Sequence, residues 1–300
     1  MKIHVQRAKF SHEGTFLMSF AKTARDLGHT LVKDSAGADL LLQWGARPRH
    51  GSPALYVELA WLPRWTYQVS HKGINANHHL ARPKLDKLTR DQKWKVELIL
   101  RHAYEGKGMP NDWGYMQRAE IDNAPSEPYI LAPLQMASDV NMDSVPEGLR
   151  NNQSFIDHIS ELDLPFPVYF KQHPNSQAKQ QMALKVRRRQ DHIWRHKDGS
   201  VYQLLGAGTV TALVAGNSNC LHDCLIYDTP AIALGRGVWP RRIFGDALNL
   251  RYFEGFIADW NRDDWRKRRA QYVHWLSRVQ WKLSDSADPK RVAAAIEGAM

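Results

Sequence analysis

The chain has 300 residues with 43% hydrophobic content and a formal net charge of +10, enough for two domains with apolar cores. No apolar run approaches the roughly 20 residues that a membrane span needs, and the start lacks a signal-peptide pattern, so we expect a cytoplasmic protein without a transmembrane segment. The positive charge favours an anionic partner such as nucleic acid, an anionic polysaccharide or a membrane surface, although ordinary solubility charge would also account for it.

The first part of the chain alternates short apolar segments with amphipathic helices. Strands are expected at 2–6, 29–33, 38–43 and 53–59. Helices are expected at 13–28 and at 89–105, the second with Thr89 as its cap. Residues 60–85 are rich in Trp, Pro, His and Asn and predict an irregular loop. This alternation predicts a Rossmann-like α/β half.

A Pro- and Gly-containing stretch at 106–128 predicts a linker, after which the alternation resumes. Further strands are expected at 129–135, 166–172, 200–205, 210–215 and 230–234. Further helices are expected near 146–162, 176–190, 218–226, 262–283 and 287–299. The fold class is therefore α/β, with Rossmann-like halves at 1–125 and 126–261 and C-terminal helices at 262–300 that cross back to the first half.

Residues 213–235 carry the strongest signal, because they predict a strand, a tight turn, a short helix and a second strand. A helix N-terminus presents unpaired N–H groups and a positive dipole end, which suits a phosphate. The turn residues at that position are Gly216, Asn217 and Ser218. The only two cysteines, Cys220 and Cys224, lie four residues apart on the same helix and are expected in the core rather than in a disulfide or metal site.

Two other strands end in polar residues that should reach the same edge of a parallel sheet, where ligands bind. Gln135, Ser138 and Asp139 lie at or just after the end of the strand at 129–135, and Lys171, His173 and Pro174 lie at or just after the end of the strand at 166–172. Lys171 can neutralise a phosphate and His173 can donate a hydrogen bond to it. The alternative is that Ser138 or Asp139 only caps a helix.

The segments Leu-Ala-Pro-Leu-Gln, Phe-Lys-Gln-His-Pro and Val-Ala-Gly-Asn-Ser, followed by Asp-Thr-Pro-Ala-Ile-Ala-Leu-Gly, span roughly residues 129–240. Together they resemble the C-terminal half of capsule polysaccharide glycosyltransferases, including the Kdo transferases that start capsule chains. The resemblance implies a GT-B fold, in which two Rossmann-like halves face a cleft and the C-terminal half holds a nucleotide-sugar. No obligatory cofactor or metal is implied, and the co-substrate would be a UDP- or CMP-sugar.

Residue by residue, His173 and Pro174 match the His-Pro motif of that family, and Asn217 and Ser218 match its motif at the donor phosphate. Asp223 stands where the family often has Glu, which implies a ribose contact, whereas Asn219 stands where Thr is common. The predicted donor-binding residues are Gln135, Ser138, Lys171, His173, Pro174, Gly216, Asn217, Ser218 and Asp223.

The first half does not show the resemblance and is expected to bind the acceptor. Glu58 ends an apolar strand and is the first candidate for the base that deprotonates the acceptor hydroxyl, with Asp139 the second. The alternative for Glu58 is an ion pair with a nearby arginine. Residues 61–79 interleave cations with aromatic rings, a pattern that grips phosphates and stacks on bases or sugars. The predicted acceptor contacts are Arg47, Arg49, Trp61, Arg64, Trp65, His71, Lys72, Asn75 and His78.

These features predict a glycosyltransferase that acts on a hydroxyl of an acidic polymer. The leading hypothesis for the acceptor is hydroxymethylpyrimidine in bacteriophage DNA, whose base would have to flip from the stack, in the host cytoplasm. One alternative is a capsule or lipopolysaccharide enzyme that acts on a saccharide or a lipid-linked acceptor. Another is a non-catalytic nucleic-acid-binding protein on the same scaffold.

Overall fold

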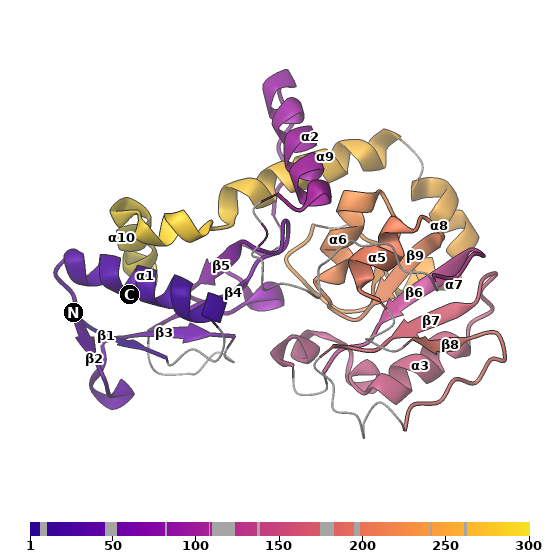
Figure 1. The fold of residues 1–300 in the computed structure, drawn as a ribbon, viewed down its shortest axis with the longest axis horizontal. Coiled ribbons are helices and arrows are strands. Elements are labelled where there is room, and N and C mark those ends of the chain that lie inside the picture. Colours follow the sequence, from indigo (N-terminus) through magenta and orange to yellow (C-terminus); the bar gives the residue numbers. More distant parts are fainter. Residues whose placement is uncertain are drawn as a thin grey trace. The chain divides into compact units, whose positions relative to one another are not determined.

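The computed structural model describes residues 1–6, 11–45, 53–81, 83–107, 109, 124–136, 139–174, 183–194, 199–240, 242–260 and 263–300. Its Cα positions group into two compact units. We call Met1–Pro83 with Trp275–Met300 the N-terminal unit and Lys84–His274 the central unit. Each unit contains one five-stranded sheet (Figure 1). The α/β class and the two Rossmann-like sheets are as predicted.

The sheet of the N-terminal unit has the order β2-β1-β3-β4-β5. Its elements are β1 (Lys2–Val5), α1 (Ser11–Asp26), β2 (Thr30–Val32), β3 (Leu40–Trp44), β4 (Ala54–Leu59) and β5 (Tyr67–Ser70). The first four strands are parallel, and β5 runs antiparallel to β4. The prediction of an irregular loop over 60–85 missed β5, which is only four residues long.

The C-terminal segment returns to this sheet, as the fold prediction required. Trp281 and Tyr67 exchange two backbone hydrogen bonds of 2.7 Å each, so the chain after α9 (Asp263–Val279) extends the β5 edge. The following helix α10 (Pro289–Glu297) buries Val292 and Ile296 against the same apolar face that α1 covers. This packing joins the two ends of the sequence in one core.

The sheet of the central unit has the order β10-β9-β6-β7-β8 and is entirely parallel. Its strands are β6 (Tyr129–Pro133), β7 (Val168–Lys171), β8 (His192–Trp194), β9 (Val210–Ala215) and β10 (Ala231–Ala233). Besides α9, the α-helices of this unit that the structure describes are α2 (Arg90–Glu105), α3 (Asn152–Ser160), α5 (Val201–Gly206), α6 (Cys220–Tyr227), α7 (Ala247–Arg251) and α8 (Phe253–Trp260). The apolar strands lie in one core with α3 and α8.

The chain divides near residues 83 and 274, compared with the predicted boundaries at 125 and 261. Helix α2 groups with the central unit because it packs on α6, where Tyr104 meets Tyr227 edge-on at 5.7 Å. The first turns of α9 also pack there, and Trp265 Nε1 donates to the Ile243 carbonyl at 3.1 Å. These side-chain contacts are tertiary and leave no local signal in the sequence.

Two secondary-structure predictions in the central unit are wrong. The segment predicted as a strand at 200–205 is helix α5, which begins with a capping box formed by Ser200 and Gln203. The described part of the helix predicted at 176–190 is not helical but a turn that leads into β8. The cap at Thr89, by contrast, is confirmed by a capping box with Gln92. Cys220 and Cys224 are buried and unbridged, as expected for core residues.

Within the described ranges, no helix is long and apolar enough to cross a membrane.

Candidate donor site at the carboxyl edge of the central sheet

The turn after β9 is held by the side chain of Gln135, which follows β6. Gln135 Nε2 donates to the Asn217 carbonyl at 3.3 Å, and its Oε1 accepts the Asn217 N–H at 3.4 Å. Both residues are buried, and the Gln135 carbonyl itself accepts from Asn152 Nδ2 at 2.8 Å. Gln135 therefore fixes the backbone of the predicted phosphate turn rather than pointing out to solvent.

The Asn217 side chain continues this network toward the 3₁₀ helix η4 (Val140–Ser144). Asn217 Nδ2 donates to Ser144 Oγ, whose hydroxyl donates to the Asn141 carbonyl at 2.8 Å. Asp139 Oδ1 accepts the Asn141 N–H at 2.9 Å and caps η4, which is the alternative that the sequence left open. Burial raises the pKa of Asp139, while its hydrogen bonds to Asn141 act in the opposite direction.

Two glycines allow the backbones at this edge to approach closely. The Gly235 N–H donates to the Gly216 carbonyl at 2.7 Å, and a Cβ on Gly235 would lie 2.8 Å from that oxygen and 3.2 Å from the Ser144 carbonyl. A Cβ on Gly216 would lie 3.0 Å from Val145 Cγ2. Side chains other than hydrogen would therefore push β9, β10 and η4 apart.

Only some of the amides at the start of α6 are available to a ligand. Gln135 takes the N–H of Asn217, and Ser218 Oγ accepts the N–H of Cys220 at 3.2 Å. Among the described residues, the N–H groups of Ser218 and Asn219 have no hydrogen-bond partner. Both residues are partly exposed. Two adjacent free amides at the N-terminus of an eight-residue helix make a small anion-binding surface.

A cavity of about 560 Å³ lies beside this turn. It is lined by Asp143, Ser144, Val145, Pro146, Arg150, Ala233, Leu234, Gly235, Arg236, Asp246, Ala247 and Leu248. Arg150 Nε donates to the Val145 carbonyl at 2.9 Å. The backbone N–H of Arg236 donates to the Ser144 carbonyl at 3.0 Å, and the residue is exposed. Sequence reasoning missed Ser144, Arg150 and Arg236, although Arg236 lies three residues after the end of β10 and could have been found by the rule that identified Gln135.

The other predicted donor residues differ in how far they are exposed to solvent. Lys171 is buried with Nζ 3.4 Å from the Gln172 carbonyl, His173 is partly exposed and Pro174 is exposed. Asp223 is fully buried and accepts a hydrogen bond of 2.7 Å from the Tyr202 hydroxyl. Ser138 lies outside the described residues. A ribose contact by Asp223 stays a prediction and would require a change from this inward orientation.

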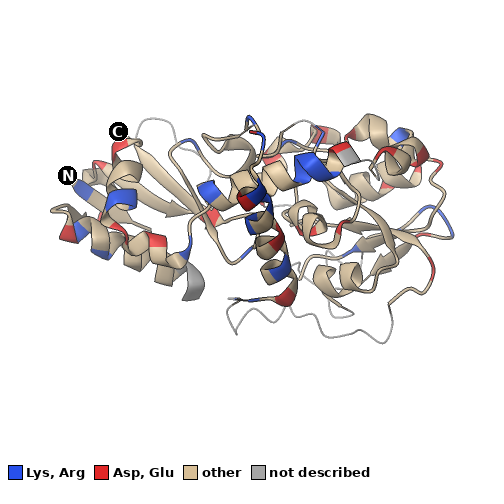
Figure 2. Cartoon of the chain, turned by 90° about the horizontal axis from the view of Figure 1, so that it is seen from above, with Lys and Arg blue, Asp and Glu red and all other residues tan. Residues whose placement is uncertain are grey.

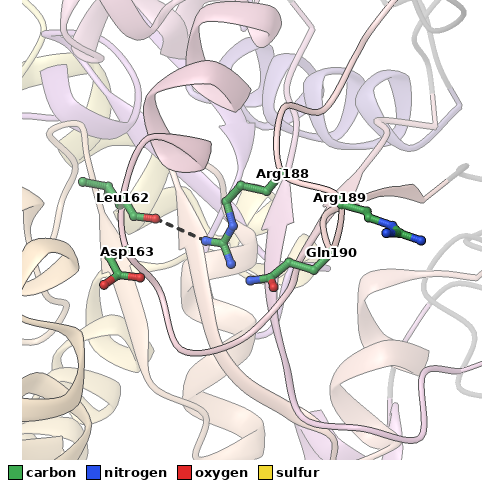
Figure 3. A pocket seen from close by; sticks show the side chains of 5 residues that line it. All are labelled: Leu162, Asp163, Arg188, Arg189 and Gln190. Carbon is green, nitrogen blue, oxygen red and sulfur yellow. Dashed lines mark hydrogen bonds between the residues drawn. The ribbon is translucent and has the colours of Figure 1, made fainter.

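A larger cavity, of about 640 Å³, lies at the amino-terminal ends of β7 and β8 and is separate from this turn (Figure 3). Its wall includes Arg188, whose guanidinium donates to the carbonyls of Leu162, Leu164 and Phe166 and faces the buried Asp191. These contacts hold the loop before β7 in place. Because ligands of parallel sheets bind at carboxyl ends, this cavity is not the expected donor site.

In the N-terminal unit, one face of the sheet is apolar and the other is unusually polar. Strand alternation places Gln43, Tyr56, Glu58, Gln68 and Ser70 on the face away from the apolar core. Glu58 is partly exposed, and its Oε1 accepts the Leu59 N–H at 2.8 Å. The carboxylate needs the glycine at position 45, which has φ +52°, because a Cβ there would lie 2.8 Å from Glu58 Oε2.

Three predicted acceptor contacts are buried in this unit. Trp61 Nε1 donates to Asn75 Oδ1 at 2.9 Å, and Gln68 Nε2 donates to the same oxygen at 3.0 Å. His78 is also buried, and burial is the main cause that lowers its pKa to about 3. The residues thus stabilise the loop after β4 rather than forming its outer surface.

The remaining predicted acceptor contacts reach the surface to different degrees. Arg64, Trp65 and His71 are partly exposed and Lys72 is exposed. Arg47 and Arg49 lie outside the described residues. No group of three or more His, Cys, Asp or Glu side chains within the described ranges is placed to hold a metal ion.

The architecture is that of known sugar transferases. Over 82% of this chain and 82% of the other, it is similar to Thermosulfurimonas dismutans KpsC, a beta Kdo 2,7 transferase, with a TM-score of 0.53 and 13% identity. A second structure from that organism, the KpsC beta Kdo 2,4 transferase, matches over 90% of both chains with a TM-score of 0.54 and 15% identity. The chain therefore has the GT-B fold that the capsule-enzyme resemblance implied. By sequence, it matches no family model and no curated protein.

Proposed function

We propose that this protein is a glycosyltransferase that moves a sugar from a nucleotide-sugar to a hydroxyl of a saccharide or polymer acceptor. The observation that carries the proposal is the turn after β9, where Gln135 immobilises Asn217 and the amides of the partly exposed Ser218 and Asn219 have no partner among the described residues. A preformed pair of amides at a helix N-terminus can stabilise the charge that develops on a departing nucleotide phosphate. The cavity beside the turn offers room for the rest of the donor.

The proposed roles follow from position and chemistry. His173 would donate a hydrogen bond to the leaving phosphate. Lys171, the buried last residue of β7, would contribute positive electrostatic potential. Arg236 joins them as a candidate because it is exposed on the cavity wall. For the base that takes the acceptor proton, Glu58 and Asp139 both remain candidates. The raised pKa of the Asp139 carboxyl brings it closer to the range in which a general base works at neutral pH.

For the acceptor, we favour a saccharide, as in capsule or wall-polymer synthesis, over DNA. The two similar structures are Kdo transferases, so an acidic sugar is the donor to test first. The DNA hypothesis depended on an aromatic and cationic loop, yet its Trp61, Asn75 and His78 are buried. Basic and acidic residues are mixed along α2 (Figure 2), and ion pairs join Glu105 to Arg101 at 2.9 Å and to Lys107 at 2.8 Å, so this helix does not present a purely basic surface to DNA.

A donor and acceptor panel tests the proposal. Purified protein is incubated with UDP- and CMP-sugars, including an acidic sugar, and with saccharide primers or hydroxymethylated DNA, and products are weighed by mass spectrometry. We expect transfer to a saccharide primer, and His173→Ala should lower kcat about 100-fold or more. His192→Ala, an exposed histidine on β8 of the same unit, is the matched control. Mass added only to DNA would reverse the acceptor assignment.

Salt-sensitive DNA binding without turnover of any donor would instead indicate a nucleic-acid-binding protein.

A further inference from the structure

The turn after β5 carries three imidazole rings in a face-to-face stack. The centroids of His78 and His79 are 4.5 Å apart with 22° between the ring planes, and those of His79 and His71 are 4.8 Å apart with 29°. His78 is the buried end of the stack, whereas His71 is partly exposed and His79 and Lys72 are exposed. The outer part of the stack is therefore accessible to a ligand.

Ser70 fixes the tautomer of the middle ring. Its hydroxyl oxygen accepts the backbone N–H groups of Lys72 at 3.2 Å and of His79 at 3.0 Å, which occupies both lone pairs. The remaining O–H can therefore only donate, and His79 Nδ1 lies 3.0 Å away. His79 Nδ1 is thus an acceptor, so the proton of the neutral ring resides on Nε2.

The surroundings keep the exposed rings neutral. Burial, followed by the charges of His71 and Lys72, lowers the pKa of His79. Burial, followed by the charge of Lys72, lowers the pKa of His71. His78 stacks on the other face of His79 and carries no charge near neutral pH, because its own pKa is about 3. Among the described residues, the permanent cation of this surface is Lys72, and it lies beside His71, which can still gain a proton.

We propose that His71, Lys72 and His79 form a binding site for one anionic oxygen group, a carboxylate or a phosphodiester, on the acceptor. His79 would donate from Nε2–H, Lys72 would supply the charge, and Ser70 would act as a positioning residue through the His79 tautomer. The assignment to the acceptor rests on the proposed function, whereas anion binding itself does not. A metal is a poor fit, since His79 Nδ1 and His78 Nδ1 already accept hydrogen bonds, the latter from Leu80 N–H at 3.1 Å.

The site has a characteristic dependence on pH. A bound anion offsets the repulsion from Lys72 and so raises the pKa of His71, whereas His79 stays neutral because its Nδ1 accepts the Ser70 O–H. The complex then holds more protons than the free protein, and by linkage its affinity falls as pH rises, by up to about tenfold per pH unit for one proton. A purely apolar or hydroxyl-binding surface would show no such linkage.

The test is isothermal titration calorimetry on the full chain at several pH values, in buffers of different ionisation enthalpy. The probes are methyl glucuronide, a glycerol phosphodiester and neutral methyl glucoside. We expect at least one acidic probe to bind with proton uptake and the neutral probe to bind at least tenfold more weakly. The acidic probe that binds more tightly shows whether the site prefers a carboxylate or a phosphodiester on the acceptor.

Variants separate the roles of the residues. Lys72→Met and His79→Phe should each weaken binding about fivefold or more, whereas Lys33→Met, an exposed lysine of the same unit, should not. His79→Gln keeps a donor near the Nε2 position, so it should retain binding, and proton uptake should persist because His71 takes the proton. Ser70→Ala should mix the His79 tautomers in ¹⁵N-edited NMR spectra and weaken the acidic probe.

Failure of both acidic probes to bind, equal binding of the neutral probe, or binding without proton uptake would each overturn the proposed anion site. Absence of sugar transfer from any donor, with anion binding intact, would instead contradict only the proposed function.

Discussion

Replacing Gln135 with leucine tests whether the candidate donor turn depends on buried hydrogen bonds. The substitution keeps the volume but removes the two contacts of 3.3 and 3.4 Å to the Asn217 backbone. It leaves a buried N–H and a buried carbonyl unsatisfied, at about 1–3 kcal/mol each. Because both contacts are long, the lower end applies, and we expect about 2–3 kcal/mol of lost stability. That loss corresponds to about 4–12 °C in Tm for a unit of this size.

The chain offers a matched control in Gln153. Its side chain makes a similar two-bond clasp with the Lys185 backbone, at 2.8 and 2.9 Å, and also donates to Asp157 Oδ1 at 2.9 Å, but it is only partly buried. Water can replace these contacts, so Gln153→Leu should cost less than about 1 kcal/mol although its bonds are shorter. Thermal unfolding followed by tryptophan fluorescence compares the two variants. An equal loss of Tm in both would refute the argument that burial decides the effect. Gln135→Leu should also weaken nucleotide-sugar binding, whereas Gln153→Leu should not.

Three further predictions concern stability. Gly235→Ala should lower the free energy of unfolding by about 1–3 kcal/mol in thermal melts, because the new Cβ would lie 2.8 Å from the Gly216 carbonyl oxygen. An unchanged Tm would show that the backbone of Gly216 and Gly235 can move apart without loss of stability. Ser200→Ala should cost about 1 kcal/mol by removing the α5 cap, and Ser200→Asp should restore most of it in the same melts. Since burial lowers the pKa of His78 to about 3 in the folded protein, compared with an ordinary value of 6.5, the unfolded chain binds the extra proton first as the pH falls. Stability of the N-terminal unit should therefore fall by up to about 1.4 kcal/mol per pH unit below pH 6.5, and His78→Asn should flatten that slope in urea titrations.

The long apolar strands and well-capped helices could be predicted from the sequence because their signals are local. Strand β9 matches its predicted range of 210–215, and the Thr89 cap was identified from its position before an amphipathic segment. The failures are short elements with mixed signals. Strand β5 has four residues, and α5 begins with Val-Tyr, which favours a strand, while the Ser200–Gln203 capping box that favours a helix was overlooked.

For the candidate site too, the sequence predicts the residues with a local signal but not their distant contacts. The position of Gln135, Gly216, Asn217 and Ser218 at the carboxyl edge of the sheet was predictable, because each follows an apolar strand, whereas their role in binding a donor stays a prediction. The roles of their partners were not predictable. Asn217 meets Ser144 from 73 residues away and Gln135 from 82 residues away, and such contacts depend on the completed sheet. The burial of Trp61 and Asn75 was equally hidden, because the same residue types serve a binding loop or a structural one.

The hydrogen-bond pattern of the turn also limits how it could hold a donor. Gln135 and Ser218 occupy the amides of Asn217 and Cys220, so a ligand would find only those of Ser218 and Asn219. Two adjacent amides match the oxygens of one phosphate group, and a second phosphate would need side chains such as His173 or Arg236. A nucleoside monophosphate sugar would therefore depend mainly on the turn, whereas a diphosphate sugar would depend strongly on Arg236 as well. Arg236→Met should consequently weaken UDP more than CMP in binding titrations, and an equal effect on both would show that Arg236 does not contact the second phosphate.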